Sequence, residues 1–214
     1  MMPGPISVVI PKGGVTPVKI RSLLSGNTIG ATFWTDGKCE GPMLAEYSWL
    51  LKYKGENLLF WDGEYVEIDS YPAVLTCNEK LEPWFGLEYA ETPEEKDYFR
   101  ALKLGLGSTR EKQKYLRLQL WWAGNDRLRR SPAAKLSKRH LENLEALLPL
   151  LKMEKSEDRL IRAEVLRELG RFDEALQALS RPFRNEHALT AERIRALCLA
   201  GDRRVAKVQG GGLN

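Results

Sequence analysis

The sequence has few of the side chains that carry out most enzyme chemistry. Its 214 residues include only two histidines and three cysteines. Neither His140 nor His187 has the nearby cysteine, serine motif or carboxylate spacing of a catalytic triad or metal site. The cysteines Cys39, Cys77 and Cys198 are odd in number and irregularly spaced, which argues against a disulfide framework and fits a reducing cytosol. We therefore expect no enzyme, no metal and no cofactor.

Long apolar runs and nucleotide-binding motifs are also missing. Residues 1–14, MMPGPISVVIPKGG, lack the basic stretch and the apolar run of a signal peptide, and no segment approaches the roughly 18 apolar residues that span a bilayer. Gly105-Leu106-Gly107 is too short for a dinucleotide fingerprint, and Lys12-Gly13-Gly14 lacks the rest of a P-loop. These absences predict a soluble, cytoplasmic protein with no membrane partner.

Charge is unevenly distributed along the chain, although the net charge is only +4. Residues 76–98 carry seven acidic side chains and two lysines, a balance of −5. Residues 100–139 carry twelve basic side chains and two acidic ones, a balance of +10. Either these two blocks neutralise each other in the fold, or the basic block faces an acidic partner.

The first third of the chain has the pattern of a β-sheet. Between residues 6 and 69, short runs rich in β-branched and aromatic residues alternate with turn residues. Asp36-Gly37 and Asp62-Gly63 are good hairpin signals because both residue types tolerate positive φ. A meander of antiparallel strands is the simplest topology. Trp34, Trp49 and Trp61 lie on these strands, and we expect them in the core.

Helices are predicted after residue 92. Thr92-Pro93-Glu94-Glu95 and Ser108-Thr109-Arg110-Glu111 resemble capping boxes that open two helices, which end near Gly105 and at Gly124. Residues 125–136 are predicted to form a basic loop. Ser137 caps a further helix, which Pro149 should kink or split because proline removes a backbone donor.

Residues 160–179, LIRAEVLRELGRFDEALQAL, predict two helices joined at Gly170, with Ala175 at their crossing. The order helix, Leu-Gly, aromatic, Asp-Glu-Ala-Leu resembles the middle of a tetratricopeptide (TPR) repeat. That family scaffolds binding and catalyses nothing. A partial echo follows 31 residues later at Gly201, which predicts a second, degenerate hairpin.

These patterns predict an α+β protein in which an N-terminal antiparallel β meander precedes a C-terminal α-helical bundle with TPR-like hairpins. The expected regions follow the sequence in order. They are a β-rich region at 1–75, an acidic connection at 76–92, helices at 93–209 with TPR-like hairpins at about 157–208, and a disordered tail at 210–214.

Residues 32–61, TFWTDGKCEGPMLAEYSWLLKYKGENLLFW, resemble the front of an uncharacterised bacterial family with a Cys-x-x-Cys knuckle between two tryptophan-bearing strands. The two cysteines of that pattern fall at Tyr53 and Glu56, so the thiolates of a zinc half-site are absent here. The resemblance therefore implies a knuckle-shaped hairpin that is held by packing and binds no metal.

The basic block contains the candidate site. Arg110, Lys114 and Arg117 fall at i, i+4 and i+7 and predict one exposed stripe of a helix. Trp121 and Trp122 point about 100° apart, so one of them is expected to be exposed as a partner contact. The predicted partner or phosphate-binding residues are Arg110, Lys114, Arg117, Trp121, Arg127, Arg129 and Arg130. The alternative is a solvated face that pairs with the acidic residues 76–98.

Two functions remain open on this evidence. The first is a non-enzymatic protein-protein interaction module that binds another protein, for example as a bacterial toxin-neutralising (immunity-type) or adaptor protein. The second is a nucleic-acid-binding protein that uses the basic block at 100–139. The sequence identifies neither the partner nor the oligomeric state.

Overall fold

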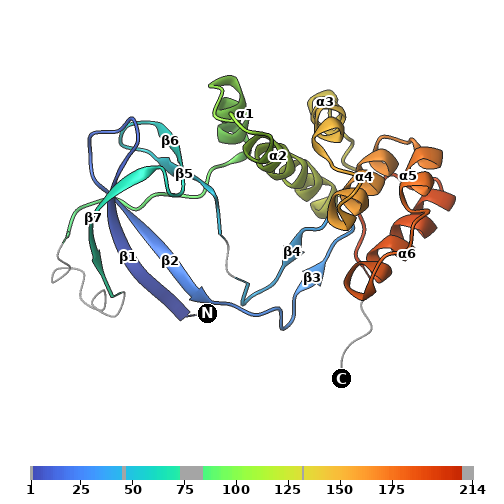
Figure 1. Ribbon diagram of the computed structural model, residues 1–214, viewed down its shortest axis with the longest axis horizontal. Coiled ribbons are helices and arrows are strands. Elements are labelled where there is room, and N and C mark those ends of the chain that lie inside the picture. The colour runs from blue at the N-terminus through green and yellow to red at the C-terminus, as the bar shows by residue number, and fades with distance from the viewer. Residues whose placement is uncertain (1, 45–46, 73–83, 132, 209–214) are drawn as a thin grey trace. The chain divides into compact units, whose positions relative to one another are not determined.

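The computed structural model describes residues 2–44, 47–72, 84–131 and 133–208. The chain forms two compact units. The first comprises Met1–Ala31 and Gly41–Asp97, and the second comprises Thr32–Glu40 and Tyr98–Asn214. The described residues contain antiparallel strands in the N-terminal part and six α-helices in the C-terminal part, which confirms the predicted α+β class (Figure 1).

A three-stranded antiparallel sheet forms the centre of the first unit. Its strands are β1 (Met2–Pro11), β2 (Val18–Ser25) and β7 (Tyr65–Tyr71), in the order β2-β1-β7. Successive residues of β1 point to opposite faces. Val9 therefore packs with Val18 and Phe60 in one buried cluster. Val8 packs with Tyr71 in another.

The predicted knuckle is a hairpin of β5 (Leu50–Tyr53) and β6 (Leu58–Trp61). Tyr53 is buried in the core, and the carboxylate of Glu56 accepts the backbone N–H of Thr16 at 2.7 Å. Hydrogen bonds from Thr16 lower the pKa of Glu56. Tyr53 and Glu56 thus serve packing and hydrogen bonding. Trp61 is buried as predicted, but Trp49 is 52% exposed, so its predicted core position is wrong.

The second unit begins with a short hairpin that sequence reasoning grouped with the β region at 1–75. Strands β3 (Thr32–Phe33) and β4 (Cys39–Glu40) are joined by a turn in which Gly37 has a φ of +79°. Residues 32–40 cluster with the helices and not with the first unit. The chain near the C-terminus runs beside this hairpin, because Val208 donates its N–H to the carbonyl of Phe33 at 2.8 Å.

The six helices are separated by short connections. Helix α1 (Glu95–Lys103) contains the boundary between the two units. It begins two residues after the proline that was predicted to open it. The other helices are α2 (Arg110–Arg130), α3 (Lys138–Leu147), α4 (Ser156–Glu168), α5 (Phe172–Ala178) and α6 (Asn185–Leu199). None of the described helices is long and apolar enough to cross a membrane.

Helix α2 is longer than predicted. It continues through Gly124 to Arg130, so the predicted end at Gly124 is wrong, and the predicted loop at 125–136 is helical over 125–130. The glycine allows close packing, because a Cβ atom at this position would lie 1.9 Å from Nδ1 of His140 on α3. The predictions for Ser137 and Pro149 are confirmed. Ser137 caps α3, and α3 gives way at Leu148–Leu150 to a 3-10 turn that contains Pro149.

The predicted hairpin at 160–179 is present as α4 and α5. Gly170 has a φ of +82°, and the N–H of Arg171 bonds to the carbonyl of Leu166, which is the glycine cap that was predicted. Ala175 is fully buried. Helix α6 also ends before a glycine of positive φ, Gly201. However, residues 202–208 contain no helix, so the predicted second hairpin does not form there. Their backbone bonds to the hairpin at 32–40 instead.

Candidate binding groove

The stripe of Arg110, Lys114 and Arg117 is engaged within the second unit. Arg110 donates to the carbonyls of Pro149 and Leu150, both at 3.0 Å, and thereby caps the 3-10 turn. Lys114 forms an ion pair with the buried Asp158 of α4. These two cations tie α2 to the segments that follow α3.

The third member of the stripe, Arg117, is partly buried. Its Nη1 lies 3.3 Å from the amide oxygen of Asn143 on α3, and burial lowers the pKa of its guanidinium. The predicted exposed stripe is therefore exposed only at Arg110, whereas Lys114 and Arg117 are partly buried on a packing face of α2. None of these contacts is the predicted pairing with the acidic residues 76–98. Residues 76–83 lie outside the described part of the chain.

Trp121 and Arg129 lie in the interior. Trp121 is 0% exposed and donates its indole N–H to Glu168 of α4 at 2.9 Å, so it offers no contact to a partner in this conformation. Arg129 forms ion pairs with Asp36 and Asp126. Of the seven predicted binding residues, Arg127 and Arg130 have exposed side chains at the end of α2, and Arg110 is exposed at its start.

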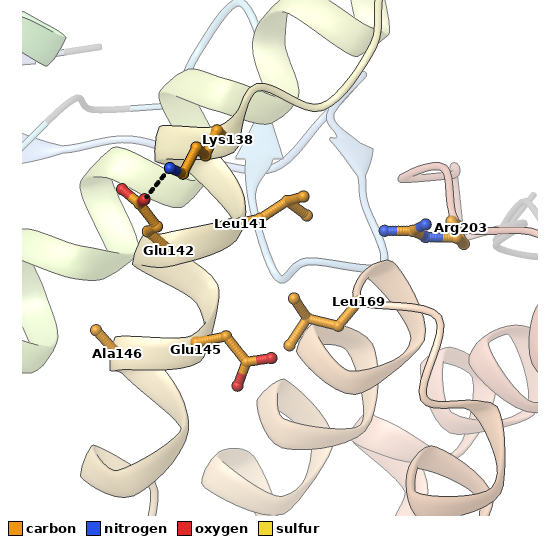
Figure 2. Close-up of a pocket in the computed structure, with 7 residues that line it drawn as sticks. All are labelled: Lys138, Leu141, Glu142, Glu145, Ala146, Leu169 and Arg203. Carbon is orange, nitrogen blue, oxygen red and sulfur yellow. Dashed lines mark ion pairs between the residues drawn. The ribbon is translucent and has the colours of Figure 1, made fainter.

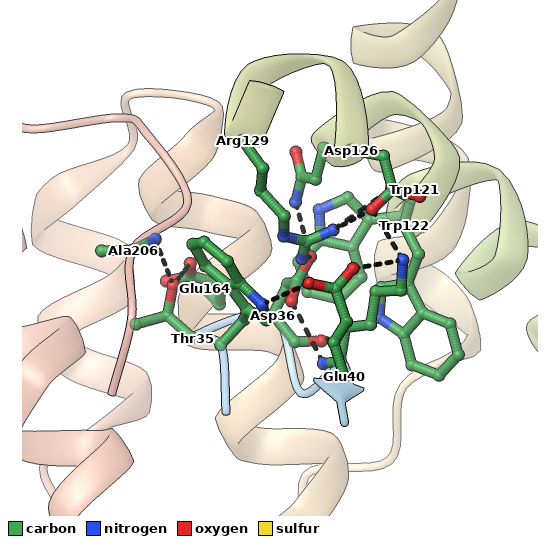
Figure 3. Close-up of polar contacts among 12 residues, drawn as sticks. Thr35, Asp36, Glu40, Trp121, Trp122, Asp126, Arg129, Glu164 and Ala206 are labelled. Carbon is green, nitrogen blue, oxygen red and sulfur yellow. Dashed lines mark hydrogen bonds and ion pairs between the residues drawn. The ribbon is translucent and has the colours of Figure 1, made fainter. Parts of the chain in front are cut away.

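Asp36, at the tip of the β3–β4 hairpin, inserts into a buried polar cluster (Figure 3). Its carboxylate accepts the amide of Asn125 at 2.9 Å and pairs with Arg129, and its carbonyl accepts the indole N–H of Trp122 at 3.1 Å. Burial raises the pKa of Asp36, although Arg129 and Asn125 oppose this shift. The buried Asp36 thus attaches the β3–β4 hairpin to α2.

Thr35 connects the same hairpin to α4 and to the C-terminal segment. Its hydroxyl donates to the carboxylate of Glu164 and accepts the N–H of Ala206 at 3.1 Å. Glu164 also receives Nε of Arg167 at 2.8 Å. Burial raises the pKa of Glu164, and Arg167 beside it acts in the opposite direction. Arg167 donates further to the carbonyl of Arg204 at 2.9 Å.

Sequence reasoning missed Glu164, Arg167 and Glu168, all of which are 0% exposed. They occupy i, i+3 and i+4 on α4, a spacing that on a lone sequence indicates a charged surface stripe. The docked hairpin, helix α2 and residues 202–204 together cover that stripe. The available signal was local, since Thr35 and Asp36 directly follow Phe33 and Trp34 in a short turn.

The buried carboxylates hold the unit together and do not form an open active site. Asp36, Glu164 and Glu168 have at most 2% exposure, so no substrate reaches them in this conformation. His140 lies 3.6 Å from Glu168 and is also buried. Across the described residues, no group of three metal-binding side chains is arranged to hold an ion.

An open groove of about 680 Å³ lies between α3 and the end of α4 (Figure 2). Leu141, Ala146 and Leu169 give it an apolar lining, and charged residues surround this lining. The charged residues that line the groove are Lys138, Glu142, Glu145 and Arg203. An apolar surface with a polar rim is the usual composition of a protein-binding site.

Most of the rim charges have partners. Glu142 lies 3.8 Å from Lys138, and Glu145 lies 3.2 Å from Arg171. Arg203 donates Nε to the carbonyl of Glu168 at 2.8 Å, which covers one of the last carbonyls of α4. Figure 2 shows its guanidinium directed toward Leu141 and Leu169.

Comparisons with protein-family models, with curated proteins and with solved structures find no match. The resemblances of residues 160–179 to a TPR repeat and of residues 32–61 to the knuckle family therefore stay predictions.

Proposed function

We propose that the second unit is a non-enzymatic protein-binding module and that the groove between α3 and α4 receives the partner. The observation that carries this proposal is an open volume of about 680 Å³ with an apolar lining and a charged rim. Binding energy at protein interfaces comes mainly from apolar anchors in such pockets, while the rim excludes water and sets orientation.

The buried polar cluster supports this proposal through rigidity. It ties α2, α4, the β3–β4 hairpin and residues 202–206 together by ion pairs and hydrogen bonds. A groove whose walls are already ordered loses little conformational entropy on binding. A toxin-neutralising or adaptor role in the cytoplasm is the finer form of this proposal, and the free thiols of Cys39 and Cys198 are compatible with it.

A site-specific photo-crosslinker tests the groove directly. Benzoylphenylalanine placed at Ala146, inside the groove, should capture a partner of defined mass in cells that express the protein. The matched control carries the same group at Gln177, an exposed position of α5 outside the groove lining. A Leu141→Lys change in the Ala146 probe should abolish the adduct, because a charge would then occupy the apolar lining.

The adducts at positions 146 and 177 distinguish the groove from other binding surfaces. An adduct at position 146 that persists with Leu141→Lys would argue against the groove as the binding site. Adducts at position 177 with none at position 146 would move the interface elsewhere, and the proposal would be abandoned.

A second candidate function has its own observation. The end of α2, the following turn and the start of α3 present exposed cations at Arg127, Arg130, Lys135, Lys138 and Arg139. The first turn of α3 contains no acidic residue, although the helix dipole favours acids there. Cations placed against this preference are compatible with nucleic-acid binding through phosphates.

Gel shifts on duplex DNA at low and physiological salt test this candidate. Five phosphate contacts predict a log–log slope of roughly −4.5 between affinity and salt. Replacing Arg130, Lys135 and Arg139 by glutamine should then remove most of that slope. No binding at low salt would eliminate nucleic acid as the partner, and binding that the triple variant retains in full would eliminate these cations as the binding surface.

A further inference from the structure

The acids of the groove rim already have basic partners, whereas one base does not have an acidic one. Glu142 faces Lys138, and Glu145 faces Arg171. Arg203 uses Nε for the carbonyl of Glu168. Within the described part of the chain, the two Nη atoms of Arg203 have no hydrogen-bond or ion-pair partner. Arg171 is shared with Glu174, so the feature that distinguishes Arg203 is not an excess of positive charge but a guanidinium edge with no acidic partner among the described residues.

Arg203 is exposed and is held by one hydrogen bond and by its contact with Gly170. Its stem lies over Gly170, where an added Cβ atom would approach Cδ to 3.5 Å. The φ of +82° at Gly170 ends α4 and leaves the carbonyl of Glu168 open to Nε of Arg203. One edge of the guanidinium is thus anchored, and the edge that carries the Nη atoms is directed toward the apolar lining (Figure 2).

From this arrangement we infer that the groove binds an acidic peptide segment of the partner. An apolar side chain of the segment packs against Leu141 and Leu169, and a neighbouring carboxylate receives the Nη atoms of Arg203. The planar guanidinium donates two parallel hydrogen bonds to a carboxylate, which gives both orientation and affinity. This inference rests on the proposed protein-binding function and specifies the chemistry of its partner.

The apolar lining favours a peptide over a phosphate chain. A nucleic-acid backbone presents charged phosphates and polar sugars but no apolar side chain, so it would leave Leu141, Ala146 and Leu169 poorly covered. A peptide with an aliphatic residue beside aspartate or glutamate satisfies the lining and the guanidinium together. The groove also carries Glu142 and Glu145, whose basic partners Lys138 and Arg171 limit their repulsion of such a peptide.

A random dodecapeptide library displayed on phage provides the probe. The library is selected on the full chain, after depletion on the Leu141→Lys variant to remove peptides that bind elsewhere. The expected result is enrichment of sequences that place aspartate or glutamate within a few residues of leucine, isoleucine or phenylalanine. Enriched peptides are then synthesised in acid and amide forms, glutamate against glutamine, and their affinities are measured by fluorescence anisotropy.

A double-mutant cycle assigns the acid to Arg203. Changing glutamate to glutamine in the peptide, or Arg203→Gln in the protein, should each weaken binding about tenfold, because a charge-assisted hydrogen bond is lost. The two changes together should cost little more than either alone. Arg203→Lys should restore part of the affinity, and thermal melts check that the variants stay folded. The peptide change leaves the protein intact, so it tests the contact even if Arg203→Gln unfolds.

Each outcome decides one of the two claims. Selected peptides that lack acids, or whose acid and amide forms bind equally, overturn the assignment to Arg203 and leave the groove as the protein-binding site. Independent, additive losses in the cycle also overturn it. Failure to select any peptide that distinguishes the parent protein from Leu141→Lys counts against both the inference and the proposed function, and the photo-crosslinking result at Ala146 then separates the two.

Discussion

Asp36 and Arg129, 93 positions apart in the chain, form a buried ion pair that joins the β3–β4 hairpin to the last turns of α2. Asp36 has no exposed side-chain surface, and its carboxylate also accepts the amide of Asn125 at 2.9 Å and the backbone N–H of Lys38 at 3.1 Å. The ring of Trp34 also lies 4.7 Å from the guanidinium of Arg129. The β3–β4 hairpin is therefore held by Arg129, which was predicted to bind a partner or phosphate.

We expect Arg129→Ala to destabilise the protein by about 3–5 kcal/mol, because it leaves the carboxylate of Asp36 buried without its cation. Arg130→Ala is the matched control, since its side chain is exposed one residue further along the helix, and it should change stability by less than about 0.5 kcal/mol. Urea denaturation measures both variants. Equal costs would show that the Asp36 pair does not hold the hairpin.

Trp121→Phe should cost about 1–3 kcal/mol. The change preserves most of the apolar ring but removes the N–H that Glu168 accepts at 2.9 Å in a fully buried site. Trp122→Phe should cost less, about 0.5–1.5 kcal/mol, because its indole donates to the neutral carbonyl of Asp36. Chemical denaturation of the two variants decides whether losing the hydrogen bond to the buried carboxylate costs more than losing the one to the carbonyl. A larger loss from Trp122→Phe would reverse this assignment.

The α4–α5 hairpin gives a prediction about packing and backbone. Ala175→Leu should cost roughly 1–3 kcal/mol, because Ala175 is 0% exposed within the helical core and added methylene groups overpack a well-packed core. Gly170→Val should do comparable harm, since a β-branched residue resists a φ of +82°. Glu174→Gln is the control and should have little effect. Its exposed carboxylate pairs with Arg171 at the surface, where ion pairs contribute little. Thermal melts that leave the first two variants with the melting temperature of the parent would contradict this packing.

The buried carboxyls predict an unusual dependence of stability on pH. Burial raises the pKa of Asp36 and of Glu164 above the ordinary values, so the folded protein keeps protons that the unfolded chain has released. The free energy of unfolding should therefore fall as pH rises from about 4.3 through the raised pKa values. Acids with lowered pKa, such as Glu40, change stability only below that range.

Urea denaturation of the parent protein and of Glu164→Gln at several pH values above 4.3 measures this effect. The difference between the two isolates the carboxyl, because the other titrating groups are common to both. That difference should shrink as pH falls, since a protonated glutamate resembles glutamine. A constant difference would show that Glu164 is ionised throughout the range.

The helix caps and helix ends could be predicted from the sequence, because they depend on residues that are neighbours along the chain. The caps at Ser137 and Gly170 and the break at Pro149 each follow from the backbone preference of one residue. The direction of the basic stripe could not be predicted, because Lys114 faces Asp158, 44 positions away. Helical spacing shows which residues share a face but not which face is covered. The groove depends likewise on Arg203, which reaches it from a segment that was expected to be helical.

At Gly124, local helix propensity and long-range packing predict opposite effects of the same substitution. In a helix interior, alanine is favoured over glycine by about 1 kcal/mol, so local propensity alone predicts that Gly124→Ala stabilises α2. The structure predicts the opposite, because the new Cβ atom would lie 1.9 Å from Nδ1 of the buried His140. We expect a net loss of about 1–3 kcal/mol from overpacking.

The double variant Gly124→Ala/His140→Ala tests the cause of this loss. Removing the imidazole relieves the clash, so the two changes together should destabilise the protein less than the sum of the single changes. Urea denaturation of the parent, both single variants and the double variant gives the coupling. A stabilising Gly124→Ala, or costs that simply add, would mean that α2 and α3 do not meet at this glycine, and the groove wall that α3 provides would then be misplaced as well.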